Sequence, residues 1–223
     1  MTSEVFKIKD LVQRNGLFYE KFTDTPFSGK TDEGFIKDGK KTTNVKNEHG
    51  RKVGFWIEYH PNGQLEYKGE YEDNGIFESK IGTWVSYFDN GQLECKGEFK
   101  EGEKEGEWVY YFDNGQLSRK EYYKNGLLNG SRIAYFENGE LKEEGKTKNG
   151  VKDGQWVEYW DNGQLKSRGK HKKINDILRE ITEGKKIGSW VEYHKNGKLK
   201  CKGDYNKDGK EVGPWIAYWE NGQ

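Results

Sequence analysis

The chain has 223 residues, of which 31% are hydrophobic and 34% are charged, and its formal net charge is zero. So low an apolar content argues against one large hydrophobic core, and a balanced charge gives no overall attraction to nucleic acid or membranes. Aromatic residues nevertheless make up 15% of the chain, which is too many for a disordered protein. An array of repeats accounts for both observations, because each unit packs only on its neighbours.

The N-terminal residues 1–28 differ in composition from the remainder of the chain. We expect them to form a short cap, because the terminal units of a repeat array need one for solubility. The first 17 residues contain no long apolar run, so we expect neither a signal peptide nor a membrane span.

Residues 29–223 contain about eight copies of one unit, G-x-W-[VI]-x-Y-x-x-N-G-x-L, and Arg132 alone replaces the tryptophan in the clear copies. The string YFDNGQL is identical at 87–93 and 111–117. The first copy is weaker and has Asp38-Gly39 in the place of Asn-Gly. Self-similarity at a nearly fixed period is the signature of a repeat protein.

The Asn-Gly pair in each unit predicts a β-hairpin with a type I′ turn, since both residues tolerate a positive φ. The register then places Trp156 opposite Gly169 and Trp190 opposite Gly203. We expect each tryptophan ring to cover the glycine opposite it in its own hairpin. Trp108 departs from this rule, because its partner is Glu121.

Alternation along the strands sorts the residues of each unit onto two faces. One face carries Trp, the aromatic residue after Tyr, and Leu; the other carries Val or Ile and Tyr, opposite charged residues. We expect the tryptophan face to be the more buried. The predicted fold is all-β, an elongated single-layer antiparallel meander of tandem β-hairpins with about sixteen strands.

Two places depart from the regular spacing. An insertion at about 170–187 contains Ile174, Ile177, Leu178 and Ile181, whose spacing fits either a short helix or an extended hairpin. The last strand, Trp215–Trp219, has no returning partner in the sequence. We expect it to present an open edge to which another copy of the chain could add a strand.

The sequence offers few candidates for catalysis, and we expect no enzyme and no cofactor. His60 and His194 occupy a slot that holds Phe or Trp in most other units, which favours a structural role. The motifs of zinc and phosphate sites do not occur. Cys95 and Cys201 lie four units apart, too far for a disulfide, which requires Cα atoms within about 7 Å. Reduced thiols indicate a cytoplasmic protein.

The unit G-x-W-x-x-Y-x-x-N-G-x-L-x-x-K-G resembles the bacterial variant of the MORN repeat, as found in YwqK-like antitoxin proteins. The segment RNGLFYEKFTDTPFSGK at 14–30 also resembles the opening of those proteins. The resemblance implies a single-layer array of hairpins that binds or neutralises a partner, such as a toxin. The Asn-Gly turn departs from the eukaryotic repeat, whose proposed lipid and kinase roles are therefore not carried over.

The leading hypothesis is a protein-binding module, in particular an antitoxin or immunity protein. Two units place Trp where the others have Phe or His, and exposed aromatic residues often dominate interfaces. The insertion offers a second set of contacts. The predicted contact residues are Trp160, Trp219, Lys172, Lys173, Ile177, Leu178 and Arg179.

Residues 166–202 contain twelve Lys or Arg and four acidic residues. This bias supports an alternative, a structural or membrane-peripheral scaffold that binds anionic lipid through its basic C-terminal third. Nucleic-acid binding by the same segment is a less favoured hypothesis, which predicts a steep salt dependence. The favoured explanation of the bias itself is a solvated face, together with an insertion that its lysines keep soluble.

Overall fold

The computed structural model describes residues 7–14, 17–22, 25–31, 34–37, 40–42, 45–46, 49–173 and 184–223. These residues form nineteen strands and one short 3-10 helix, η1 (Ile8–Asp10), and they contain no α-helix. The strands are β1 (Val12–Arg14), β2 (Leu17–Tyr19), β3 (Gly29–Thr31), β4 (Gly34–Lys37), β5 (Lys40–Thr42), β6 (Val45–Lys46), β7 (Lys52–Tyr59), β8 (Leu65–Asp73), β9 (Glu78–Tyr87), β10 (Leu93–Lys100), β11 (Glu103–Tyr111), β12 (Leu117–Lys124), β13 (Leu127–Tyr135), β14 (Leu141–Lys148), β15 (Val151–Tyr159), β16 (Leu165–Lys172), β17 (Lys185–Tyr193), β18 (Leu199–Tyr205) and β19 (Glu211–Ala217). Most of the insertion lies outside the described residues, so its conformation stays a prediction.

The chain divides into two compact units. The first unit comprises Met1–Gly91 and Phe99–Gly102. It contains the hairpin β1-β2, the three-stranded sheet β3-β4-β5, and the consecutive strands β6 to β9. Leu11 and Phe27 are buried against Phe18, so the N-terminal part of this unit has a small apolar cluster of its own.

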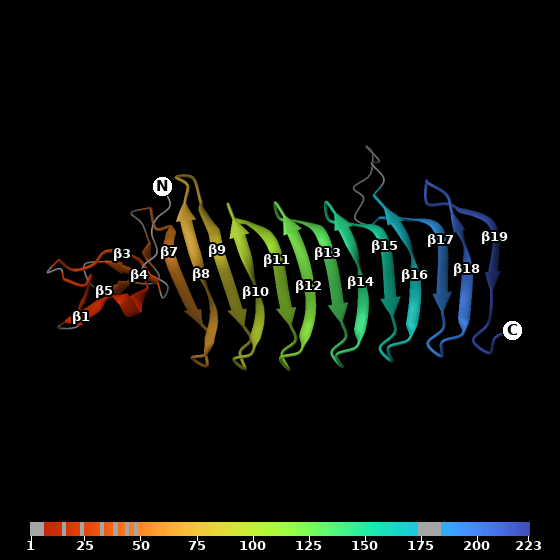
Figure 1. Cartoon of the computed structure of the whole chain (residues 1–223), viewed down its shortest axis with the longest axis horizontal. Helices are drawn as coiled ribbons and strands as arrows, with labels where there is room; N and C mark the ends of the chain where they lie inside the picture. The colour runs from red at the N-terminus through yellow and green to blue at the C-terminus, as the bar shows by residue number, and fades with distance from the viewer. Residues whose placement is uncertain are drawn as a thin grey trace. The chain divides into compact units, whose positions relative to one another are not determined.

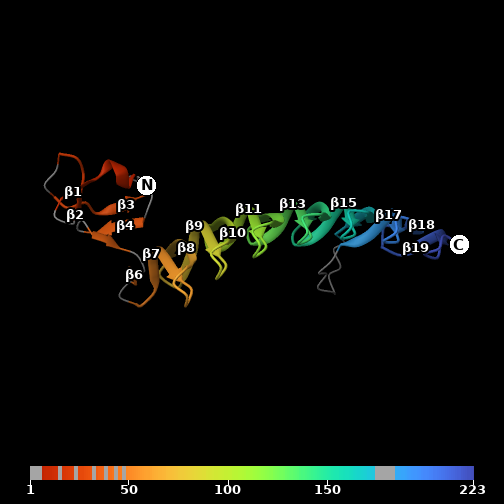
Figure 2. The ribbon, with the colours of Figure 1, turned by 90° about the horizontal axis from the view of Figure 1, so that it is seen from below.

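The second unit comprises Gln92–Glu98 and Glu103–Gln223. Its strands follow one another in the sheet in the order of the sequence, and the neighbouring strands from β11 to β19 pair antiparallel. Figures 1 and 2 show these strands as one layer of consecutive hairpins. The predicted all-β meander of tandem hairpins is confirmed.

The first glycine of each repeat marks a bulge in the strand. In β15, three residues lie between Lys152 and Trp156, whereas one residue of β14 separates their partners Thr147 and Gly145. Gly154, inside the bulge, has a φ of 87°, a conformation that favours glycine. The bulge brings the lysine and the tryptophan closer together on one face, because residues four apart in the sequence lie opposite partners only two residues apart.

The turn at the Asn-Gly pair is not type I′, and the prediction was wrong on this point. In the turn between β15 and β16, Gly163 has a φ of 77°, whereas Asn162 is not among the residues with positive φ. Gly163 N donates to Trp160 O at 2.9 Å, and Trp160 N donates to Gln164 O at 2.8 Å. These bonds are typical of a three-residue loop in which only the last residue needs a positive φ.

The type I′ combination occurs at the opposite edge of the sheet, where the repeats are joined to each other. Asn125 and Gly126 have φ angles of 48° and 72°, and Asn149 and Gly150 have φ angles of 48° and 85°. The two edges of the sheet therefore use the same dipeptide in different turns. Loop length decides between them, since an extra residue lets the asparagine keep a negative φ.

The repeated asparagines join neighbouring turns to each other. Asn162 Oδ1 accepts a bond from Gln164 N at 3.1 Å, and its Nδ2 donates to Lys195 O in the following turn at 2.9 Å. Asn138 makes the equivalent bond to Asp161 O at 2.7 Å. The sequence needs asparagine here because one side chain both closes its own turn and holds the next.

The tryptophan rings cover glycine, but not the glycine that was predicted. The register places Trp156 between Gly145 on β14 and Gly169 on β16, as expected for the latter pair. The ring lies over Gly145, where an added Cβ would be 2.4 Å from a ring atom. Trp156 Nε1 also donates to Lys146 O on β14 at 2.8 Å. Each strand has two neighbours, and this hydrogen bond orients the ring toward the preceding hairpin.

Glu121, which lies opposite Trp108 where the other hairpins have glycine, also pairs with Arg132 of the next repeat. Glu121 and Arg132 are cross-strand partners and form an ion pair of 3.1 Å. Arg132 stands in the tryptophan slot, Glu121 stands in the glycine slot, and Leu128 replaces the lysine four residues before the tryptophan slot. An ion pair between the buried Glu121 and the half-buried Arg132 therefore replaces the ring–glycine contact at this position.

Candidate binding groove on the Trp face

We use the name Trp face for the side of the second unit's sheet that carries Trp108, Trp156 and Trp190. All three rings are buried, with exposed fractions of 1–5%. The prediction that this is the more buried face is confirmed for these rings. A groove of about 520 Å³ lies on this face. It is lined by Leu128, Arg132, Thr147, Gly150, Lys152, Glu158, Trp160, Lys166, Ser167, His171, Lys186, Trp190, Glu192, Tyr193 and Lys200.

A lysine of the same repeat covers each buried tryptophan. The Nζ atoms of Lys152 and Lys186 lie 4.1 and 4.4 Å from the ring centroids of Trp156 and Trp190. An ammonium group above an aromatic ring is attracted by the negative face of the ring. The bulge at the glycine between them brings the lysine over the ring. The lysine, glycine and tryptophan positions of the motif therefore form this contact together.

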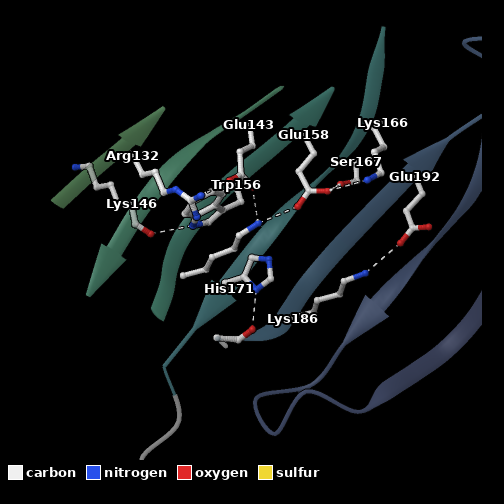
Figure 3. Close-up of polar contacts among 12 residues, drawn as sticks. Arg132, Glu143, Lys146, Trp156, Glu158, Lys166, Ser167, His171, Lys186 and Glu192 are labelled. Carbon is white, nitrogen blue, oxygen red and sulfur yellow. Dashed lines mark hydrogen bonds and ion pairs between the residues drawn. The ribbon is translucent and has the colours of Figure 1, made fainter. Parts of the chain in front are cut away.

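The lysines also connect a row of carboxylates across the groove (Figure 3). Glu143 and Glu158 are direct cross-strand partners, and two like charges in this position would repel. Lys152 Nζ lies between them, 3.0 Å from Glu143 Oε2 and 2.9 Å from Glu158 Oε1. Arg132 contacts the other oxygen of Glu143 at 3.1 Å. Both carboxylates are therefore neutralised by bases on the same face.

The next repeat forms a similar arrangement around Glu192. Its carboxylate contacts Lys186 Nζ at 3.1 Å and Lys200 Nζ at 3.4 Å. Burial by itself raises the pKa of Glu192, but the hydrogen bond from Lys186 and the neighbouring charges outweigh it and lower the pKa below its usual value. The same balance, with Lys152 as the main donor, lowers the pKa of Glu158. Both acids are thus held in the ionised form.

His171 lies between the two tryptophans of the groove. Its ring centroid is 6.4 Å from that of Trp156 and 5.0 Å from that of Trp190, in edge-to-face arrangements. Its Nδ1 lies 2.7 Å from Gly184 O, where it can donate a hydrogen bond. Burial lowers the pKa of His171, and the backbone bond offsets this only in part. The imidazole is therefore neutral at physiological pH and serves as a packed ring.

The predicted contact residues do not form one site. Trp160 lines the groove and is half-buried, and its Nε1 donates to Tyr193 O at 3.2 Å. Trp219 lies beyond β19 and is 76% exposed. Lys172 is exposed at the end of β16, whereas Lys173 is half-buried and its backbone N–H donates to Asp153 Oδ1 at 3.4 Å. The remaining three, Ile177, Leu178 and Arg179, lie outside the described residues.

The sequence analysis missed the lysines and carboxylates that build the groove. The signal was present as a lysine four residues before the tryptophan, at Lys52, Lys80, Lys104, Lys152 and Lys186. The unit with Arg132 lacks this lysine, and so does the last unit, in which Glu211 precedes Trp215. The co-occurrence of lysine and tryptophan could have indicated a direct contact between them.

The described residues contain no group of three or more His, Cys, Asp and Glu side chains that could hold a metal ion. In the same part of the chain, no helix has the length and apolar character needed to cross a membrane. Neither Cys95 nor Cys201 forms a disulfide there. The groove itself is lined by charged side chains and aromatic rings.

Comparison with known proteins identifies the repeat. A family model described as "MORN repeat variant" matches residues 52–73, 80–101, 104–125, 128–149, 152–173 and 186–207. Each matched segment begins at the lysine position of the motif and ends at or just after the end of the second strand of the hairpin. A comparison with curated proteins gave no significant match.

Proposed function

Since the chain belongs to the MORN repeat variant family, we propose that it is a non-catalytic repeat module that binds another protein. The observation that carries this proposal is the single-layer sheet of the second unit, in which no second layer covers either face within the described residues (Figure 2). Repeats of this kind are consistent with a binding module, because stacking them extends one continuous surface.

We further propose that the partner is a toxin and that the chain acts in the cytoplasm as an antitoxin or immunity protein. The resemblance of the repeats to those of YwqK-like proteins motivates this step. A stable antitoxin complex requires an extended interface with a few well-packed aromatic residues at its centre. Trp160 suits this role, since it lines the groove and is half-exposed.

Affinity capture from native lysate followed by co-expression tests the proposal. The tagged chain should retain one stoichiometric protein that arrests growth when expressed alone, and co-expression of the chain should restore growth. The Trp160→Ala variant should weaken the complex by about 2 kcal/mol or more. Retention of a harmless protein would contradict the antitoxin role alone.

A lipid-binding scaffold predicts a different result. Such a protein would retain no protein and would instead float with vesicles of anionic lipid at low salt, but not at high salt. That result would contradict the protein-binding proposal and support the lipid-binding scaffold in its place. Self-association through β19 would appear as a concentration-dependent increase in mass in sedimentation, without any partner.

A further inference from the structure

The second unit has a second face, which we call the Val face because it carries Val109, Ile133, Val157, Val191 and Ile216. Cross-strand partners form a continuous row on it, with a charged residue between each two aliphatic ones. The row runs Val109, Lys120, Ile133, Glu144, Val157, Arg168, Val191, Lys202 and Ile216. The charged members of this row are all exposed.

Basic residues outnumber acidic residues on this face. The returning strands β12, β14, β16 and β18 carry eight exposed bases on this face, Lys120, Lys124, Lys146, Lys148, Arg168, Lys170, Lys172 and Lys202, which we call the basic comb. The exposed acids on the same strands and face are Glu144 and Asp204, and Asp204 accepts a bond from Ser189 Oγ at 2.7 Å. The face therefore carries a local excess of positive charge, although the whole chain is neutral.

The bases of the comb make no ion pairs with other described residues, because none of their direct cross-strand partners is acidic. Arg168 lies between Val157 and Val191, and Lys202 lies between Val191 and Ile216. Nine ion pairs of the second unit's sheet, by contrast, involve residues of the Trp face or of the turns. The comb thus holds solvated charges that an oppositely charged partner can engage without breaking an internal pair.

From this arrangement we infer that the Val face docks an acidic segment or surface of the partner protein, an inference that rests on the proposed protein-binding function. Bases at alternate positions of one strand are about 6.8 Å apart, which is also the spacing of alternate side chains in an extended acidic segment. The aliphatic residues between the bases supply apolar contacts, as protein interfaces require beside their charges.

The composition of the face favours protein over nucleic acid. Single-stranded nucleic acid binds where aromatic rings stack on the bases and lysines follow the phosphates. Between Arg168 and Lys202, however, the row has Val191, and next to Lys202 it has Ile216. Glu144 in the middle of the row would repel phosphates, whereas a protein partner can place a base opposite it.

Binding of a fluorescent glutamate oligomer to the full chain, followed by anisotropy at low salt, tests the inference. The wild-type chain should bind it, and the double variant Arg168→Glu/Lys202→Glu should bind about tenfold more weakly or worse. The matched control is Lys207→Glu/Lys210→Glu, which changes the net charge equally at exposed residues of the turn after β18. The control should bind as the wild type does.

Two further probes separate the competing ligands. A single-stranded DNA oligomer of equal charge and vesicles containing phosphatidylserine should both bind more weakly than the glutamate oligomer at the same salt concentration. Tighter binding of either probe, equal losses in both double variants, or no binding of the glutamate oligomer would overturn the inference. The proposed function fails separately, if affinity capture retains no protein.

Discussion

The two faces of the second unit differ in whether their lysine and arginine side chains form ion pairs within the protein. On the Trp face, Lys152 bridges two carboxylates and covers a buried ring. On the Val face, Arg168 stands between two valines and contacts no carboxylate among the described residues. The same residue types therefore stabilise the fold on one face and remain available to a partner on the other. What differs is the cross-strand neighbour, which sets whether a charge is neutralised within the protein.

The largest expected effect comes from removing a ring of the Trp face. Trp156 is 1% exposed, so Trp156→Ala should lower the free energy of unfolding by about 3–5 kcal/mol. The matched control is Trp160→Ala at a half-buried position in the groove, where the loss should be clearly smaller. Urea denaturation followed by circular dichroism measures both. Equal losses would mean that the ring–glycine contact does not organise this face.

Adding a methyl group beneath the same ring should be the next most disruptive change. A Cβ on Gly145 would come within 2.4 Å of the Trp156 ring, so Gly145→Ala should cost about 1–3 kcal/mol of unfolding free energy. Lys146→Ala, one residue away on the Val face, should change stability by less than about 0.5 kcal/mol. Comparable values for the two variants in urea denaturation would contradict the position assigned to the ring.

The ion pair that replaces tryptophan and glycine should matter nearly as much. Glu121 is 5% exposed and contacts both Arg119 and Arg132. Glu121→Gln should therefore lower the unfolding free energy by about 1–3 kcal/mol, because Arg119 and Arg132 both lose their ion pair with a buried carboxylate. Glu144→Gln on the exposed Val face is the control and should be nearly neutral. Restoring the repeat with Glu121→Gly/Arg132→Trp/Leu128→Lys should recover stability; failure to do so would argue against equivalence of the two pairs.

The pH dependence of stability should depend on His171. Its pKa lies below the ordinary value of 6.5 in the folded chain, so the unfolded chain binds more protons as the pH falls. The free energy of unfolding therefore has its full contribution from neutral His171 above pH 6.5, and this contribution decreases progressively as the pH falls below 6.5. Tyr123 and Tyr205 occupy the equivalent slot in other repeats, so His171→Tyr should flatten this part of the profile. An unchanged profile in thermal unfolding between pH 5 and 7 would be evidence against this role.

The smallest effect on stability is expected on the Val face. Arg168→Glu/Lys202→Glu should leave the unfolding free energy within about 0.5 kcal/mol of the wild type, since neither base has an internal ion pair among the described residues. Thermal unfolding at physiological salt measures this. A large loss would show that the comb supports the fold, and the contrast between the two faces would then disappear.

The register of the hairpins could be predicted from the repeat, because side-chain alternation and turn position depend on neighbouring residues along the chain. Trp156 opposite Gly169, Trp190 opposite Gly203 and Trp108 opposite Glu121 all follow the prediction. The turn type could not be predicted from the repeat, since Asn-Gly suits both a type I′ turn and the last two positions of a three-residue loop. The choice depends on loop length and on the bond from Asn162 to the following turn.

The candidate groove was less predictable than the fold. Trp160 was selected from the repeat pattern and lies in the groove, but Lys152, Glu158 and Glu192 were not selected. These residues come from different strands, and their relation depends on which neighbouring strand each side chain leans toward. Lys172, although selected, lies on the opposite face from the groove, at the end of the basic comb.

By itself, the sequence determined the repeat, the consecutive hairpins and the register within each hairpin, because these follow from local alternation and turn positions. The tertiary structure decided which glycine each tryptophan covers, since every strand has two neighbours and only three-dimensional packing distinguishes them. It also decided which lysines are neutralised. An ion pair such as that of Lys152 with Glu143 forms across strands, where a bulge and a neighbouring repeat bring the charges together.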